Sequence, residues 1–344
     1  MSPWVGRAVG RQGGRRVLAA SSVFLASGLS LLGMGHGIAV FLAAWSLVGL
    51  GMGAGLYDPA FAALGRMYGH AARPAITTLT LFGGFASTVC WPLSAFLLTH
   101  FGWRGACLSY AAFHLLMMLP LYLFGLPRES ERQSAPEATP EPSDGLPVPT
   151  IEPGRAVVVM LAVVTTLSAM ISTLLSVHLL TILQSRGVSL TAAVALGALV
   201  GPSQVGARTV ELLLARNHHP VWTKLASAAL VVVGVGGLWL ATPTLSLSLM
   251  LYGGGIGLES IARGTLPLAL FSPARYAAIM GMLAMPTLIA EALTPSIGAA
   301  LIGAIGMEQT LAVLTAIAVV SLLIAAAIPF GLKRHSWSSE LKSQ

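Results

Sequence analysis

Long runs of apolar residues, separated by short polar or glycine- and proline-rich turns, follow one another along almost the whole chain. A helix needs roughly 20 apolar residues to cross the hydrocarbon core of a bilayer, and ten runs come close to that length or exceed it. The pattern therefore predicts an all-α integral membrane protein with about ten transmembrane helices. These runs lie at 17–36, 38–65, 74–99, 105–126, 156–183, 190–214, 221–241, 245–271, 276–303 and 308–332.

The composition excludes a water-soluble globular protein. Hydrophobic residues occupy 55% of the 344 positions and charged residues only 9%, whereas a soluble domain carries about 25% charged residues. The sequence shows no Ser/His/Asp set, metal-ligand cluster or phosphate-binding loop, so we expect neither an enzyme nor a cofactor. Nothing in it is typical of a selectivity filter or a ring of charges, which disfavours a channel.

The basic residues are distributed unevenly over the predicted topology. Ten spans place both termini on one side, and about fifteen of the 19 Lys and Arg residues fall on that side. Arg104 and Arg186 fall on the other side, while Arg208 and Arg263 lie inside spans. Because positive residues concentrate in cytoplasmic loops, we expect cytoplasmic termini, and topology explains the net charge of +7 without nucleic-acid binding. The excess of arginine over lysine, with abundant alanine and glycine, favours a GC-rich bacterium and its inner membrane.

The segment 127–154 differs from the rest of the chain in composition. It places several acidic residues among prolines and serines, a mixture that cannot bury enough apolar surface to fold. We therefore predict a disordered cytoplasmic linker there. It separates an N-terminal bundle of four helices over 1–126 from a C-terminal bundle of six helices over 155–333, and 334–344 form a cytoplasmic tail.

The two bundles resemble each other at an offset of about 200 residues, as expected for an internal repeat. Val5-Gly6-Arg7 resembles Val205-Gly206-Ala207-Arg208, and the glycine run at 51–56 resembles the run at 253–258. In this register the halves run in the same direction, and residues 156–200, the first two helices of the second bundle, have no counterpart before Met1. We therefore expect a parallel pseudo-repeat whose first half lacks its two opening helices.

Two sequence motifs indicate how the helices are arranged. The stretch Gly6 to Arg16 resembles the loop between helices 2 and 3 of the major facilitator superfamily, and Gly102-Trp103-Arg104 resembles the motif that opens that family's helix 6. Two parallel six-helix halves joined by a cytoplasmic linker are the plan of that family. The resemblance implies an N-terminally truncated 12-helix fold and secondary transport by alternating access.

Three departures from the family's patterns bear on the mechanism. The acidic position of the loop motif is Gly10, and the arginine of the helix-4 antiporter motif would fall at Leu47. The helix-5 antiporter motif survives only as Pro92, with Trp91 where glycine is usual. These losses put in doubt the cytoplasmic latch and proton coupling through helix 4.

Ionisable side chains inside spans are costly in a bilayer, so they are functional candidates. Glu259 lies near the predicted midplane, with Arg263 one turn deeper on the same face. In the resembling family this helix lines the central cavity. The two residues either bind an anionic or zwitterionic substrate or exchange a proton, or they form a self-satisfied structural pair.

Four further residues are candidates for substrate or proton binding. Tyr57 and Asp58 precede Pro59, which should kink the helix. Asp58 then faces the cavity, or it pairs near the interface with Arg66 or with the arginine-rich first loop. His178 is placed by the resemblance on a cavity helix, where it titrates or is hydrogen-bonded to a neighbour. Glu291 lies near midmembrane between two prolines and has the same two interpretations.

A second set of residues is expected at the cytoplasmic face. Arg208 and Glu211 lie near the inner end of their helix, at the repeat's equivalent of Gly6 to Arg11. We expect them to latch helices, with pairing that breaks and reforms as the halves rock; the alternative is a snorkelling arginine beside a carboxylate. The full set of latch candidates is Gly6, Arg7, Arg11, Arg15, Arg208 and Glu211.

The repeated glycine runs predict close helix packing, with a swivel that opens the cavity as a compatible alternative. The residues are Gly51, Gly53, Gly55, Gly253, Gly255 and Gly257.

Cys90 and Cys107 are too few for a disulfide framework and lack metal-ligand spacing, so we expect two small buried apolar residues and no metal site. Export of a soft metal or arsenite would need both thiols, which lie at different predicted depths.

Two functional hypotheses of different class result. In the first, the protein is a multi-pass secondary transporter of a small solute, with protons as a further partner, acting as a monomer in the bilayer. In the second, the chain is an incomplete, non-transporting fragment from a late gene-model start or a decayed gene. The second predicts little activity for this chain alone and an upstream in-frame segment of about 45 to 60 residues with two spans.

Overall fold

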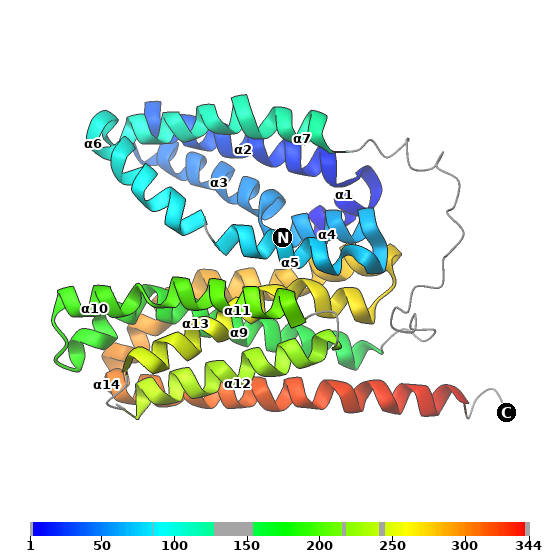
Figure 1. Cartoon of the computed structure of the whole chain (residues 1–344). Helices are drawn as coiled ribbons and strands as arrows, with labels where there is room; N and C mark the ends of the chain where they lie inside the picture. Colours follow the sequence, from blue (N-terminus) through cyan, green and yellow to red (C-terminus); the bar gives the residue numbers. More distant parts are fainter. Residues whose placement is uncertain (1–2, 85, 127–153, 215–217, 241–244, 341–344) are drawn as a thin grey trace. The chain divides into compact units, whose positions relative to one another are not determined.

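The computed structural model (Figure 1) describes residues 3–84, 86–126, 154–214, 218–240 and 245–340. Helices make up nearly all of this part of the chain, and it contains no strand. The predicted linker 127–154 lies outside the described residues except for Gly154, which is the N-cap of a helix. Of the predicted tail 334–344, the backbone is described only to Glu340, where the last helix ends.

The first part of the chain forms helices of 7 to 28 residues. Their bounds are α1 Pro3–Gln12, α2 Gly14–Met34, α3 Ile38–Gly55, α4 Tyr57–Tyr68, α5 Arg73–Gly84, α6 Ala86–Phe113 and α7 Leu119–Gly125. A 3₁₀ turn, Gly69–Ala72, precedes α5, and a π-helical segment, His114–Met118, joins α6 to α7.

After the segment that is not described, the helices are longer. Their bounds are α9 Arg155–Ser185, α10 Leu190–Gly197, α11 Val200–Leu214, α12 Pro220–Trp239, α13 Leu245–Leu270 and α14 Pro273–Glu340.

The helices account for nine of the ten predicted passes. In the part of the chain that the structure describes, eight helical stretches are long and apolar enough to cross a membrane. One of them, Arg275–Pro329, is interrupted at Gly306 with φ 84°, which makes two passes of it; left-handed φ suits glycine because glycine lacks a Cβ. A similar break at Gly102, φ 67°, lies inside α6.

One local expectation is wrong, and one predicted span contains a break. The arginine-rich stretch after Gly6, expected to be a loop, is helical to Gln12, and the break comes at Gly13 with φ 81°. The predicted span 38–65 is divided between α3 and α4 at Leu56, whose ψ of −166° is extended. This break lies one turn before Pro59, where a proline ring and its missing N–H disrupt a helix.

The chain forms two compact units that are described separately. Unit 1 comprises Met1–Ala72, Thr88–Thr150 and Ser272–Gly281, and unit 2 comprises Arg73–Ser87, Ile151–Phe271 and Met282–Gln344. In unit 1, α2 packs along α3 with little space between the backbones. A Cβ on Gly28 would lie 2.8 Å from the carbonyl oxygen of Ala44, and a Cβ on Gly51 would lie 2.9 Å from the amide nitrogen of Leu25.

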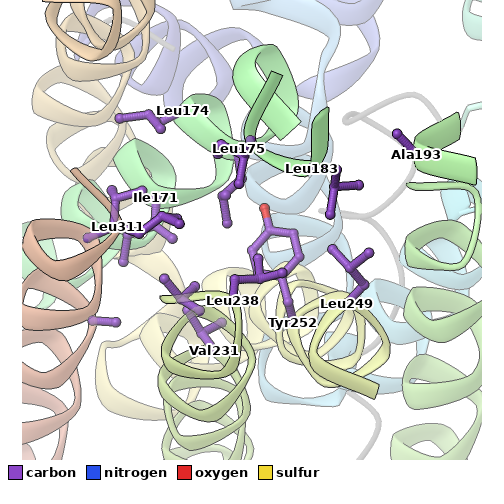
Figure 2. Close-up of a cluster of buried hydrophobic side chains, with 14 residues drawn as sticks. Ile171, Leu174, Leu175, Leu183, Ala193, Val231, Leu238, Leu249, Tyr252 and Leu311 are labelled. Atoms are coloured by element: carbon purple, nitrogen blue, oxygen red, sulfur yellow. The ribbon is translucent and has the colours of Figure 1, made fainter. Parts of the chain in front are cut away.

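In unit 2, α13 is packed tightly between α11 and α12. A Cβ on Gly257 would lie 2.5 Å from the carbonyl oxygen of Gln204 in α11, and a Cβ on Gly255 would lie 2.9 Å from that of Ser227 in α12. Beside this contact, buried side chains from α9, α10, α12, α13 and α14 form one apolar cluster (Figure 2). Its members include Ile171, Leu175, Leu183, Val231, Leu238, Leu249, Tyr252 and Leu311.

Many large apolar side chains point away from both units. Leu116 and Phe124, for example, are 79% and 83% exposed. Such side chains would be unfavourable in water, whereas lipid tails solvate them. Their exposure agrees with a bilayer as the solvent of these helices.

Candidate functional site

An ion pair lies inside the helices of unit 2. Lys224, in the second turn of α12, places Nζ 2.5 and 2.6 Å from Oε1 and Oε2 of Glu259 in α13. The side chains are only 3% and 14% exposed. Removing one partner of such a pair would leave a buried charge uncompensated.

Two serines complete the hydrogen bonding of the pair. Lys224 Nζ donates to Ser168 Oγ of α9 at 3.2 Å. Ser227 Oγ lies 3.0 Å from Glu259 Oε2 and 2.8 Å from the carbonyl oxygen of Gly255. The single hydroxyl proton of Ser227 can therefore go to either acceptor.

The pair opens onto a small pocket. The pocket is small, about 10 Å³, which is the space of about one water molecule, and Arg263 lines it together with Lys224 and Glu259. The remaining walls come from α9 and α13 and are apolar except for one threonine: Leu161, Val164, Thr165, Ala262, Leu266 and Pro267. Charged groups at one place and apolar walls elsewhere are the usual composition of a small-molecule site.

Lys224 was missed as a site residue by sequence reasoning. From the sequence, Lys224 is one of about fifteen basic residues on the side of the termini, although the predicted span 221–241 contains it. The structure buries it within α12, at 2% residue exposure. The signal that could have found it is Pro220, since proline is favoured at the first position of a helix. A helix that begins at Pro220 places Lys224 one turn inside.

Arg208 occupies a second polar site, between α5, α11 and α13. It is 4% exposed. Nη1 donates to the carbonyl oxygen of Thr80 in α5 at 2.9 Å, and Nη2 donates to Ser260 Oγ of α13 at 2.9 Å. Nε donates to the carbonyl oxygen of Gly257 at 3.3 Å. One guanidinium thus holds three helices together through its fork of donors.

Glu211, one turn further along α11, belongs to a separate cluster. Its Oε1 accepts from Thr223 Oγ1 at 2.7 Å and lies 3.3 Å from His218 Nε2 and 3.6 Å from Arg73 Nη2. Arg73 Nη1 also donates to the carbonyl oxygen of His218 at 2.7 Å. The carboxylate therefore ties the start of α5 to the connection between α11 and α12.

The adjacent His219 is the N-cap of α12. Its Nδ1 accepts a hydrogen bond from the amide of Val221 at 3.2 Å, which satisfies one of the unpaired donors at the helix start. Burial lowers the pKa of His219 below its usual range, and the nearby positive charges of Arg73 and His218 lower it further. The neutral form of the ring is the one that can accept this bond.

The remaining substrate or proton candidates are not among the residues that line the pocket. His178 Nε2 is 3.3 Å from the carbonyl oxygen of Pro295 in α14. Glu291 is partly exposed in the same helix. In unit 1, Asp58 is 7% exposed in the first turn of α4, and the ring of Tyr57 stacks on Phe61 with centroids 5.4 Å apart.

Of the latch candidates in unit 1, Gly6 is buried, Arg7 and Arg11 are exposed and Arg15 is partly exposed. The guanidinium of Arg7 lies over the Trp4 ring, 4.5 Å from its centroid. The structure thus divides the predicted set: Arg208 and Glu211 bond within unit 2, and the arginines near the N-terminus belong to unit 1.

The glycine candidates differ in their surroundings. A Cβ on Gly253 or Gly257 would overlap the backbone of α11, and a Cβ on Gly255 would overlap the backbone of α12. A Cβ on Gly55 would lie 2.5 Å from Ser21 Oγ of α2, whereas a Cβ on Gly53 would meet nothing within 4 Å.

The described residues contain no group of three or more His, Cys, Asp and Glu side chains that could hold a metal ion. Cys90 is exposed and Cys107 is partly exposed, and both are free thiols.

A multi-pass helical protein with a charged pair inside its spans is built like a membrane transporter. A profile of the Major Facilitator Superfamily matches residues 1–261. The chain therefore belongs to this family. Since its members are transporters, the chain is a multi-pass membrane transport protein and not an enzyme.

Solved structures show the same fold at low sequence identity. The human organic anion transporter MFSD10 (TETRAN) is 17% identical with a TM-score of 0.73, over 94% of this chain and 79% of that one. The proton:xylose symporter XylE bound to 6-bromo-6-deoxy-D-glucose is 13% identical with a TM-score of 0.69, over 93% and 81%. A double Trp mutant of XylE gives a TM-score of 0.75 at 13% identity, over 95% and 82%. No curated protein gives a significant sequence match.

Proposed function

We propose that this protein carries a small solute across a bacterial inner membrane by alternating access, as a monomer with both termini in the cytoplasm. The solute or its coupling proton binds at Lys224 and Glu259. The observation that carries this proposal is the burial of this ion pair in two membrane helices beside a pocket. Ionisable groups inside a membrane protein mark the paths of solutes and ions.

Two comparisons support a charged solute or a coupling proton. One structural neighbour is named as an organic anion transporter and another as a proton symporter. Since both share only the fold, the pocket of this chain has to supply its own selectivity. Two cations and one carboxylate line it, and this favours solutes with a negatively charged group.

The Arg208 and Glu211 clusters have a different role in this proposal. The Arg208 cluster connects α11 with α5 through the carbonyl oxygen of Thr80. The Glu211 cluster connects α11 with α5 through Arg73. We assign them to the latch that breaks and reforms as the pocket opens to one side of the membrane and then to the other.

The test is solute counterflow into proteoliposomes that contain the purified full chain. The panel comprises radiolabelled organic anions, amino acids, sugars and arsenite. We expect one class to accumulate above protein-free vesicles, and Lys224→Met to lose this activity. Glu308→Gln, which changes an exposed carboxylate in α14, is the matched control and should keep it. Wild-type flux no higher than that of empty vesicles for every solute would contradict the proposal.

A further inference from the structure

One carboxylate oxygen of unit 2, Oε1 of Glu211, has three donor groups around it. Thr223 Oγ1 of α12 donates to it at 2.7 Å, while His218 Nε2 lies 3.3 Å and Arg73 Nη2 of α5 lies 3.6 Å away. The last distance is longer than a hydrogen bond. Thr223 and His218 therefore hold the carboxylate more closely than Arg73 does.

The surroundings of the His218 ring indicate where its protons are. Nδ1 lies 3.1 Å from the carbonyl oxygen of Leu214, which can only accept, so Nδ1 carries a hydrogen. Nε2 lies 3.1 Å from Thr223 Oγ1, whose single proton goes to Glu211, and 3.3 Å from the carboxylate itself. Both ring nitrogens thus face acceptors. An imidazole that donates from both nitrogens is the protonated, positively charged form.

Loss of the Nε2 proton would change the partners of Glu211. The lone pair on Nε2 would then face a carboxylate, which repels it, and the hydroxyl of Thr223, which has a proton to donate. When this hydroxyl turns to His218, Glu211 Oε1 loses both of its close donors. The carboxylate needs replacements, because an unpaired buried charge is strongly unfavourable.

Arg73 is placed to supply the replacement donors. Its Nη1 donates to the carbonyl oxygen of His218 at 2.7 Å, whereas Nε and Nη2 are buried and have no hydrogen-bond partner among the residues that the structure describes. An edge of the planar guanidinium can bind both oxygens of a carboxylate in parallel. A small rotation of the Glu211 side chain toward α5 would therefore satisfy the unpaired donors of Arg73 and the carboxylate together.

The charged and titratable groups around His218 come from three helices. Among the described residues, those from α5 and α11 are Arg73 and Glu211. From the first two turns of α12, the charged side chain is Lys224, whose ammonium is bonded to a carboxylate of α13. His219 caps α12, and its Nδ1 accepts a hydrogen bond from the start of that helix. His218 is therefore the histidine of this cluster whose charge acts on Glu211 directly.

We propose that His218 is a pH-dependent switch of the contact between α5 and α11. With the proton on Nε2, Glu211 is held by Thr223 and His218, as in the structure. When this proton leaves to water, the Thr223 hydroxyl turns to His218 and Glu211 forms a bidentate pair with Arg73, which tightens α5 against α11. Deprotonation then slows the opening of the latch; this consequence rests on the proposed function, whereas the switch itself does not.

The test is a double-mutant cycle in the purified full chain, measured by thermal unfolding in detergent at about pH 5 and pH 8, the limits of the range in which histidine changes charge. Arg73→Gln, Glu211→Gln and the double variant are compared with wild type, because the deviation from additivity measures how strongly the two side chains interact. We expect this deviation in melting temperature to be at least about twofold larger at the higher pH, where the bidentate pair forms.

Two variants assign the pH dependence to one histidine. His218→Gln should make the coupling between Arg73 and Glu211 independent of pH, because its amide can donate to the carboxylate and does not titrate. His219→Asn is the matched control, since it replaces the neighbouring histidine and keeps a favourable N-cap. In this variant the coupling should depend on pH as it does in wild type.

A second measurement leaves Arg73 and Glu211 unchanged, so it decides the matter even if their variants do not fold. In full-length protein with ¹⁵N-labelled histidine, the ring signals that disappear in His218→Gln identify this residue. We expect them to show a doubly protonated ring at the lower pH and loss of the Nε2 proton at the higher pH. A neutral His218 ring at both pH values would overturn the proposal.

The outcomes keep the switch and the proposed function apart. Coupling of equal size at the two pH values, or a pH dependence that persists in His218→Gln, would overturn the switch and leave the transporter unaffected. Solute counterflow should decrease toward higher pH in wild type and less so in His218→Gln, and equal profiles would contradict the link to the latch. Absence of flux for every solute would contradict the proposed function alone, because the unfolding and NMR measurements use no solute.

Discussion

Lys224 and Glu259 are 35 residues apart in the sequence, and Lys224 Nζ lies 2.5 Å from Glu259 Oε1 in the structure. The contact joins neighbouring antiparallel helices and is almost completely buried. A pair in this position affects both stability and function, because neither charge can be removed alone without leaving the other in an apolar surrounding.

This relationship predicts non-additive stabilities. Lys224→Met or Glu259→Met alone should lower the free energy of unfolding by about 3–5 kcal/mol, since each leaves one buried charge. The double variant should be more stable than either single variant because both charges are gone. Thermal unfolding of the purified protein in detergent measures the three values. If the loss of unfolding free energy in the double variant equals the sum of the losses in the two single variants, the two charges do not interact.

Arg208 should be more important for stability than an exposed arginine. Each hydrogen bond from a charged donor contributes about 1.5–3 kcal/mol, and Arg208 makes several to α5 and α13. Lysine has no planar fork with which to reach the same acceptors. We therefore expect Arg208→Lys to unfold at a clearly lower temperature than wild type and Arg11→Lys, at an exposed position, to unfold like wild type. Similar midpoints for the two variants would refute this role of the guanidinium.

His219 predicts a loss of stability at mildly acidic pH. Unfolded histidine takes up its proton near pH 6.5, whereas burial and neighbouring positive charges lower the pKa of folded His219 below that value. Between the two values the unfolded state binds more protons, so stability present above pH 6.5 declines as the pH falls through this window.

The control for this prediction is the substitution His219→Asn, because asparagine is also a favourable N-cap and does not titrate in this range. In His219→Asn, the part of the acid-induced decrease that is due to this residue should disappear, while His219→Ala should lose about 1 kcal/mol at neutral pH. Melting curves at several pH values make the comparison. A pH dependence that is identical in His219→Asn and wild type would exclude His219 as the cause.

Two glycines of the repeated runs should respond oppositely to alanine. A Cβ on Gly257 would lie 2.5 Å from the backbone of α11, so Gly257→Ala must push α11 and α13 apart and destabilise the fold. Gly53 has open space at that position, and Gly53→Ala should stabilise α3 by about 0.5–1 kcal/mol because alanine restricts the unfolded backbone. Melting temperatures that move in the same direction for both variants would contradict this difference.

The sequence predicts the spans well because the length of an apolar run is a direct measure of what can cross a bilayer. The all-α membrane fold and the family are confirmed by the helices and by the profile match over residues 1–261. Breaks were harder to locate: Gly102 and Gly306 interrupt helices by their positive φ, whereas Gly51, Gly53 and Gly255 remain helical.

The site was only partly predictable. Glu259 stands out as a carboxylate in an apolar run, but its partner depends on the register between α12 and α13, which no local pattern specifies. Lys224 lies so close to the start of α12 that its charge resembles that of a loop residue. Lys224 is hydrogen-bonded to Glu259, and Arg263 lines the same pocket.

The most direct test of the central claim, that Lys224 and Glu259 form the solute site, is equilibrium binding of a panel of radiolabelled organic anions to the purified protein. We expect saturable binding to wild type and to Glu308→Gln with the same affinity, and at least about tenfold weaker binding to Lys224→Met, because the anion loses its cation. Binding to Lys224→Met with wild-type affinity would contradict the claim.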